Sequence, residues 1–258
     1  MGSLESPAGP ATPLPAPAPK IWKFWGTTLW GALIFAAMFA GQFLLVAGFF
    51  VAKGPPFDFG SIKTVAGSGT VISLSVIMGL PAVVAVLWLA IRLSGTPFAE
   101  YLALRRTSWT NLAIGIVALI ALVIGWDIVS RAIGREIAPG FMVDVLKSAQ
   151  ADGALWLLVV AFSVAAPVTE ELMVRGFLYR GWSESFLGTT GAIVLSSLVW
   201  TAMHAQYYDW FPFSEVMSIG LLLGYMRYRS RSTWLTIIMH GLNNFAATAQ
   251  TIWLAGQH

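Results

Sequence analysis

Residues 154–180, ALWLLVVAFSVAAPVTEELMVRGFLYR, decide the fold of this chain. The stretch is apolar enough to be a membrane helix, yet Glu170 and Glu171 lie side by side within it and Arg175 follows. Charges at membrane depth cost several kcal/mol or more, so they are rare and are retained for a function or for a paired structural role. The stretch therefore predicts a membrane helix that faces a buried polar cavity.

The composition supports a membrane protein. The 258 residues are 57% hydrophobic and 10% charged, and the mean hydropathy is +0.74. Soluble domains carry about 25% charged residues. The net charge of +3 is modest, and the basic residues lie beside the predicted helix ends, which argues against a nucleic-acid surface. The absence of cysteine excludes disulfides and thiolate metal sites.

Seven segments are long enough to cross a bilayer, which takes about 20 apolar residues. They are 25–52, 71–93, 109–133, 154–180, 187–205, 213–228 and 233–254. We predict an all-α, polytopic transmembrane bundle of about seven helices, with the active site between the fourth, fifth and seventh. Residues 137–150 have a short amphipathic pattern that could lie in the membrane interface.

The chain is expected to form one membrane domain, residues 20–258, after a Pro- and Ala-rich tail at 1–19 that cannot build a core and should be disordered. With the N-terminus inside, ten of the fifteen Lys and Arg residues fall on the cytoplasmic side. The positive-inside rule then predicts a cytoplasmic N-terminus in a bacterial inner membrane. Arg175 and Arg180 count as cytoplasmic only if the fourth helix stops there. We favour a longer, tilted fourth helix, which lowers the cytoplasmic count of ten by one or two.

The charges of the fourth segment differ in their expected partners. Glu171 and Arg175 are four residues apart, so on a helix they can pair. Glu170 points about 100° away and lacks that partner, which suits a general acid or base in a low-dielectric cavity. Pro167 should free the Ser163 carbonyl and kink the helix, opening polar space there. The alternative is a purely structural ion cluster that braces the helices.

His204 lies on the fifth segment, one helical turn after Trp200. Taken alone, it is best explained as a core histidine bonded to a backbone carbonyl. Taken with Glu170, it could hold one water molecule between imidazole and carboxylate.

His240 and Asn244 are four residues apart on the seventh segment, so they share a helix face. A neutral imidazole and a carboxamide aimed at one point suit a developing oxyanion. Asn243 is expected to face elsewhere, as a hydrogen-bonding contact between helices.

These three motifs carry a family resemblance: EELMVR at 170–175, WTAMH at 200–204 and HGLNN at 240–244. Together they resemble the CPBP family of CAAX proteases and bacteriocin-processing enzymes, also called Abi proteins, over about residues 156–254. The resemblance implies a glutamate-type intramembrane endopeptidase with its catalytic core at 154–256. Its substrate would be a membrane-associated peptide or protein, with prenylated and bacteriocin-like peptides as candidates.

By position, the resemblance assigns water activation to Glu170 and His204 and the oxyanion hole to His240 and Asn244. Glu171 and Arg175 would support the site. Trp200 departs from the family pattern, which usually has Phe there, and this aromatic exchange could narrow the cavity.

Several alternatives stay open. Two histidines and one or two carboxylates could bind zinc with an open position for water. No H-E-x-x-H motif is present, however, and Asn244 is a poor zinc ligand, so we expect catalysis without a metal or other cofactor. A non-catalytic binding or immunity protein could use the same cavity. A transporter is a further option, although the chain lacks the repeated halves of many transporter folds.

Overall fold

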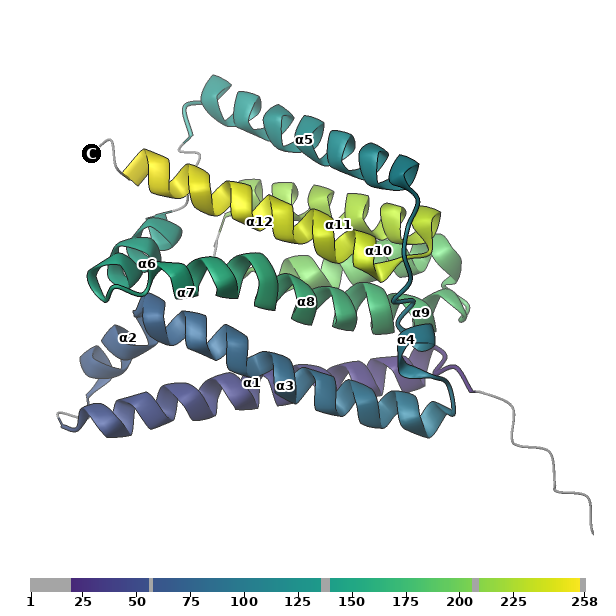
Figure 1. Ribbon diagram of the computed structural model, residues 1–258, viewed down its shortest axis with the longest axis horizontal. Helices are drawn as coiled ribbons and strands as arrows, with labels where there is room; N and C mark the ends of the chain where they lie inside the picture. The colour runs from purple at the N-terminus through teal and green to yellow at the C-terminus, as the bar shows by residue number, and fades with distance from the viewer. Residues whose placement is uncertain (1–19, 56–57, 136–139, 206–208, 256–258) are drawn as a thin grey trace, which may run out of the picture.

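The computed structural model describes residues 20–55, 58–135, 140–205 and 209–255. The predicted tail at 1–19 lies outside these residues. Every regular element of the described chain is a helix (Figure 1). The helices are α1 (Phe24–Lys53), α2 (Phe59–Gly67), α3 (Gly69–Ser94), α4 (Phe98–Tyr101), α5 (Trp109–Ala132), α6 (Gly140–Ala151), α7 (Leu155–Val160), η1 (Ala161–Ala165), α8 (Ala166–Glu171), η2 (Leu172–Leu178), α9 (Tyr179–Ser183), α10 (Gly188–Ala202), α11 (Trp210–Ser230) and α12 (Thr233–Ala255).

Each of the seven predicted segments is helical, which confirms the predicted class of a polytopic helical bundle. Four helices in the described chain are long and apolar enough to cross a membrane by length and composition: Phe24–Lys53, Gly69–Ser94, Trp109–Ala132 and Leu155–Ser183. Large apolar side chains such as Trp25, Phe43 and Val117 are exposed on the outside of the bundle. Such a surface is expected of an integral membrane protein, because lipid solvates it.

The fourth segment is the innermost of these helices. Half of its most apolar window is buried, against 11% for α1 and for α5. It runs without a break from α7 to α9 and contains two π-helical stretches, η1 and η2, on either side of α8. A π turn carries an extra residue and is frequent at functional sites. The two glutamates lie at the end of α8, between the two wide turns.

Pro167 explains the first wide turn. It lacks the N–H that would bond one turn back, to the Ser163 carbonyl, and the π-helical stretch η1 ends two residues before it. The Ser163 carbonyl lies close to α12: a Cβ built on Gly241 would sit 2.8 Å from its oxygen. A glycine at 241 thus lets α12 approach the fourth segment and brings the polar residues of both segments together.

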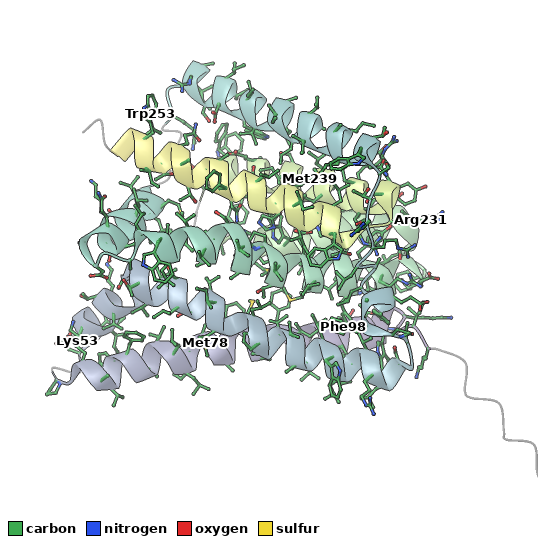
Figure 2. The ribbon with its side chains drawn as sticks, in the orientation of Figure 1. Lys53, Met78, Phe98, Arg231, Met239 and Trp253 are labelled. Carbon is green, nitrogen blue, oxygen red and sulfur yellow. The ribbon has the colours of Figure 1, made fainter. Side chains whose placement is uncertain are left out.

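The bundle has two distinct ends. At one end lie the start of α1, α4, α9 and the loop between α11 and α12 (Figure 1). At the other end lie α2, α6 and the ends of α1 and α12, marked by Lys53 and Trp253 in Figure 2. Helix α6 covers most of the predicted amphipathic stretch, while 137–139 lie outside the described residues. It buries Val145, Leu146 and Ala149 in a small cluster with Leu158.

Candidate active site

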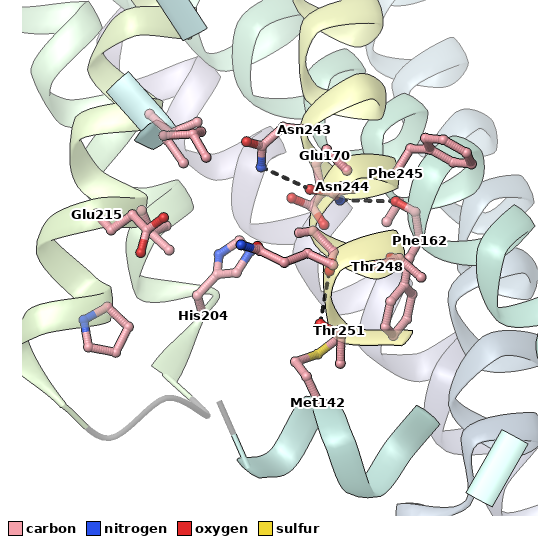
Figure 3. A pocket seen from close by; sticks show the side chains of 18 of the residues that line it. Met142, Phe162, Glu170, His204, Glu215, Asn243, Asn244, Phe245, Thr248 and Thr251 are labelled. Carbon is pink, nitrogen blue, oxygen red and sulfur yellow. Dashed lines mark hydrogen bonds between the residues drawn. The ribbon is translucent and has the colours of Figure 1, made fainter. Parts of the chain in front are cut away.

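A cavity of about 1440 Å³ lies between α1, α3, α5, α6, α8, α10, α11 and α12. Its wall includes Glu170, His204, Asn243 and Asn244, which come from three different predicted segments (Figure 3). The predicted fourth, fifth and seventh segments therefore meet at one cavity inside the bundle, where these polar side chains gather.

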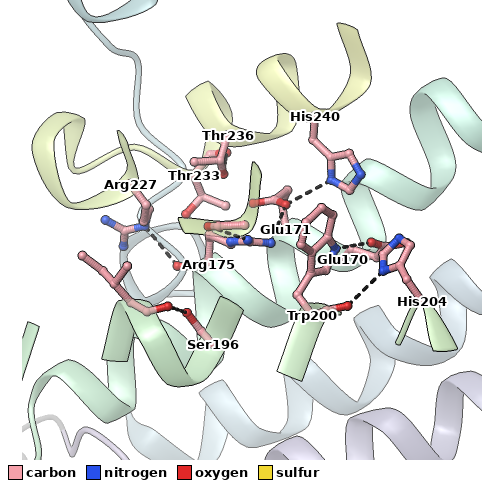
Figure 4. Close-up of polar contacts among 12 residues, drawn as sticks. Glu170, Glu171, Arg175, Ser196, Trp200, His204, Arg227, Thr233, Thr236 and His240 are labelled. Carbon is pink, nitrogen blue, oxygen red and sulfur yellow. Dashed lines mark hydrogen bonds and ion pairs between the residues drawn. The ribbon is translucent and has the colours of Figure 1, made fainter. Parts of the chain in front are cut away.

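Glu170 has a hydrogen-bond partner that was not expected. Trp200 Nε1 donates to Glu170 Oε2 at 2.5 Å. The expectation that this carboxylate is unpaired was therefore wrong, because the tryptophan in place of the usual phenylalanine supplies an indole N–H. The exchange could be seen in the sequence, but the direction of the N–H depends on how α10 packs against α8. Figure 4 shows this contact between the two helices.

His204 lies just beyond the helix on which it was predicted. Helix α10 ends at Ala202, and the His204 N–H bonds to the Thr201 carbonyl in the turn that follows. The His204 ring packs against Trp200 with centroids 4.8 Å apart, and Nδ1 lies 2.9 Å from the Trp200 carbonyl oxygen. Because a carbonyl only accepts, Nδ1 is the donor in this contact. The backbone bond expected of a core histidine is thus present, at the cavity wall.

Glu171, Arg175 and His240 form a buried cluster behind the cavity (Figure 4). Arg175 Nη1 donates to Glu171 Oε1 at 2.9 Å, the i,i+4 pair that the spacing suggests, and both side chains are fully buried. His240 Nδ1 lies 3.0 Å from the same oxygen, so it donates to the carboxylate. The Glu171 carboxylate thereby links the fourth segment to α12.

Arg175 and His240 also contact Trp200. The guanidinium carbon lies 4.8 Å from the indole centroid, and the His240 ring meets the indole edge-on at 5.2 Å. Arg175 Nη2 donates to the Gly220 carbonyl at 3.0 Å, which ties the cluster to α11. Trp200 therefore touches every charged or imidazole group of the predicted site except Glu171.

The two asparagines of α12 lie together on the cavity wall. Asn244 Nδ2 donates to the Phe162 carbonyl at 2.9 Å, and Asn243 Nδ2 donates to Asn244 Oδ1 at 3.4 Å. Phe162 belongs to η1, so the wide turn supplies this acceptor. The expectation that Asn243 faces away was wrong, because the cavity is broad enough to reach two successive positions of the helix.

The structure thus brings Glu170, His204 and Asn244 to one cavity and adds Asn243. His240 is 1% exposed and lies next to the cavity, against Trp200 and Glu171, not on its wall. Among the residues that the structure describes, no three His, Asp or Glu side chains come together in a way that could hold a metal ion. Glu170 and Glu171, in particular, face different partners.

These features define a class: a polytopic membrane protein whose central helices carry a buried Glu/His/Asn site. Residues 152–246, the part with all three motifs, match the family model described as "Type II CAAX prenyl endopeptidase Rce1-like". The match confirms the predicted CPBP/CAAX protease family for this part of the chain.

Two curated proteins are also similar. The chain is 31% identical over 86 residues to the UPF0177 protein YbdI of Lactococcus lactis subsp. lactis (strain IL1403), which is 33% of this chain and 44% of that protein. It is 25% identical over 125 residues to an uncharacterized 24.3 kDa protein of Escherichia coli, 48% of this chain and 56% of that one. The chain therefore spans about half the length of these relatives. No solved structure gives a significant match.

Proposed function

We propose that this protein is an intramembrane endopeptidase of the CAAX protease type. It hydrolyses a peptide bond in a membrane-associated peptide or protein, with water activated by Glu170 and His204. The observation that carries the proposal is the shared cavity, where a carboxylate, an imidazole and two carboxamides meet inside a membrane bundle. A large, mostly apolar cavity with a few convergent polar groups is the usual form of an active or binding site.

In the proposed reaction, water lies between the Glu170 carboxylate and His204 Nε2. The water oxygen attacks the scissile carbonyl carbon as its proton passes to one of these bases. The same proton then goes to the departing amine as the C–N bond breaks. Trp200 holds one oxygen of Glu170, so the other oxygen faces the reacting water.

The oxyanion of this reaction is stabilised by the carboxamides. One N–H of Asn244 is used by the Phe162 carbonyl, which fixes the side chain, and the second N–H is the proposed donor. His240 was assigned to the oxyanion hole by the family resemblance. Its burial against Glu171 favours a supporting role instead, in which it fixes Glu171 and the Trp200 ring.

The test compares Glu170→Gln with the native protein. Membrane peptides from cells that express each form are compared by mass spectrometry, and a cleavage product present only with native protein is expected. Glu184→Gln is the matched control, because Glu184 is 53% exposed at the other end of the bundle and should leave cleavage intact. Full biological activity of Glu170→Gln at normal abundance would reject the protease and favour the non-catalytic binding protein.

The proposed mechanism uses no metal. Activity of the purified protein should therefore survive a strong chelator, and metal analysis should find no stoichiometric zinc. Zinc that disappears in Glu170→Gln or His204→Ala, with native activity restored only when zinc is added back, would replace this mechanism with a zinc-dependent one.

We also propose the orientation predicted from charge: N-terminus in the cytoplasm, C-terminus outside, in a bacterial inner membrane. The lipid bilayer and the substrate are then the partners that the site requires. The excess of Lys and Arg at the end of the bundle near the start of α1 supports this orientation.

A further inference from the structure

Arg227, near the end of α11, is a buried arginine that the candidate active site does not use. Its side chain is 4% exposed. Nε donates to the Arg175 carbonyl at 3.0 Å, and the guanidinium carbon lies 5.1 Å from the centroid of the Tyr179 ring (Figure 4). Nη1 and Nη2 make no hydrogen bond to the described residues, yet neither of these nitrogens is fully buried. The end of the guanidinium therefore reaches the surface with its N–H donors unused.

The positive charge of Arg227 has no carboxylate beside it in the described part of the chain. The charged side chains close enough to act on it are Arg180 and Arg105, and both repel it. The other buried arginine differs, because Arg175 pairs with Glu171 at 2.9 Å. Buried charges in proteins are normally paired, since an unpaired one costs several kcal/mol or more. An anion from outside the chain would supply the missing countercharge.

The two neighbouring arginines come from other segments and are more exposed than Arg227. Arg180, on α9, has a side chain that is 30% exposed, and its ion pair with Glu184 is long, at 3.9 Å. Arg105 is exposed in the connection between α4 and α5, and Ser232 Oγ donates to its carbonyl, which fastens this connection to the turn between α11 and α12. Three arginines from distant parts of the sequence thus converge, one buried and two nearer the solvent.

We propose that Arg227, Arg180 and Arg105 form a binding site for a phosphate group, carried by the headgroup of an anionic phospholipid or present as free phosphate. Guanidinium groups suit this ligand, because their forked N–H donors match two phosphate oxygens. The site lies at the end of the bundle with α4, α9 and the start of α1, where helix ends meet the headgroup layer (Figure 1). Basic pockets between membrane helices bind anionic headgroups in this way. None of the three arginines lines the candidate active-site cavity, so the site is a separate one.

The test titrates the full chain, purified in a neutral detergent, with dioleoylphosphatidylglycerol and with zwitterionic dioleoylphosphatidylcholine, and measures each apparent Kd by native mass spectrometry. Native protein should prefer the anionic lipid. Arg227→Gln should weaken binding of that lipid about tenfold or more, the loss expected for a hydrogen bond to a charged group. Arg92→Gln is the matched control, because Arg92 is an exposed arginine at the same end of the bundle, and it should bind as native protein does. Equal affinity of native protein for the two lipids would overturn the proposal, and so would native affinity for phosphatidylglycerol in Arg227→Gln.

Arg227 also holds the Arg175 carbonyl, so a second pair of variants guards against a general loss of structure. Arg180→Gln and Arg105→Gln leave that hydrogen bond in place. Each is expected to keep the native Tm and to bind phosphatidylglycerol severalfold more weakly. Native affinity in both variants would overturn the three-arginine site even if Arg227→Gln does not fold.

Inorganic phosphate distinguishes the two sources of the ligand. If phosphate displaces phosphatidylglycerol from native protein and potassium chloride of equal ionic strength does not, the site also takes free phosphate. If the lipid stays bound in phosphate, the headgroup is the ligand. Equal displacement by both salts would show non-specific attraction of charge and would overturn the site. No cleavage is measured in these experiments, so this site and the proposed protease can fail separately.

Discussion

At the scale of single residues, Trp200 connects the groups of the candidate site. Its N–H bonds to Glu170, its carbonyl to His204, and its ring meets His204, His240 and Arg175. A phenylalanine would keep much of the ring contact but would lose the hydrogen bond. A substitution at Trp200 can therefore test the orientation of the proposed catalytic carboxylate, Glu170, separately from packing.

Trp200→Phe should lower kcat for the cleaved peptide about tenfold, with KM and Tm close to native. A hydrogen bond to a charged group contributes about 1.5–3 kcal/mol, and a tenfold change in rate corresponds to about 1.4 kcal/mol. The measurement is steady-state cleavage by purified protein, with Trp156→Phe, an exposed position, as control. An unchanged kcat would show that the Trp200 N–H does not orient Glu170 in the reaction.

Glu171 is expected to contribute to the stability of the fold and not directly to the proposed chemistry. Glu171→Gln leaves the guanidinium of Arg175 buried with its ionic partner removed, and breaking a buried pair in this way costs about 3–5 kcal/mol. A clear fall in Tm in detergent is expected, whereas Glu184→Gln at the exposed pair with Arg180 should have little effect. A Glu171→Gln protein with native Tm and no activity would instead place Glu171 in the chemistry.

At the scale of helices, the approach of α12 to η1 sets the geometry of the site. Gly241 faces the Ser163 carbonyl, and Asn244 bonds to Phe162 in the same wide turn. The sequence allowed the prediction that Pro167 frees the Ser163 carbonyl one turn before it, because proline chemistry is local. It did not allow the prediction of Gly241 as its neighbour, since that contact depends on how two distant helices pack.

Gly241→Ala should lower both Tm and cleavage, since its Cβ would meet the Ser163 oxygen at 2.8 Å and push α12 outward. Overpacking of this kind costs about 1–3 kcal/mol. Gly125→Ala on α5 is the matched control, because its Cβ meets nothing within 4 Å. Equal Tm values for the two variants would mean that α12 and η1 have room to adjust.

The Arg135–Asp209 ion pair on the cavity wall offers a pH test. The Phe211 N–H and the Arg135 guanidinium hold the pKa of Asp209 below its ordinary value, and the same carboxylate caps α11. A lowered folded-state pKa stabilises the protein above the unfolded pKa of about 4, and this contribution is lost as pH falls through the lowered value. Native protein should exceed Asp209→Asn in Tm at pH 7, and the difference should shrink below about pH 4. A difference that stays constant with pH would exclude the carboxylate charge as its source.

At the scale of the whole molecule, composition and hydrophobic length were enough to predict a helical membrane bundle, because both follow from the bilayer itself. The three motifs likewise sufficed to predict the family that residues 152–246 match, and they include three residues, Glu170, His204 and Asn244, that line one cavity. What could not be predicted is where each polar group points: His240 turns to Glu171, and Asn243 turns to the cavity. Those directions depend on the packing of helices far apart in the sequence.

The orientation of the whole chain can be tested with reporters. An alkaline phosphatase fused after His258 should be active, and a reporter ahead of residue 20 should be protected inside the cell. Helix α12 ends at the opposite end of the bundle from the start of α1, so a seven-span bundle puts the two termini on opposite sides (Figure 1). Two cytoplasmic termini would require an eighth crossing or a re-entrant segment, with the stretch that contains α6 as the first candidate.

The two π-helical stretches have a consequence for how this helix tolerates insertions and deletions. Each wide turn holds one residue more than an α-helical turn would, and the two turns flank α8. Loss of a single residue from η1 would therefore replace the wide turn by a regular α-helical turn and leave Glu170 facing the cavity. Loss of a residue from α8 ahead of Glu170 has no such turn to absorb it, and it would rotate the residues on one side by about 100° relative to the other, for a change in length of about 1.5 Å. Glu170 would then leave the cavity wall while the hydrophobic span stayed long enough for the bilayer. In this helix, the position of a deletion decides its effect on the site.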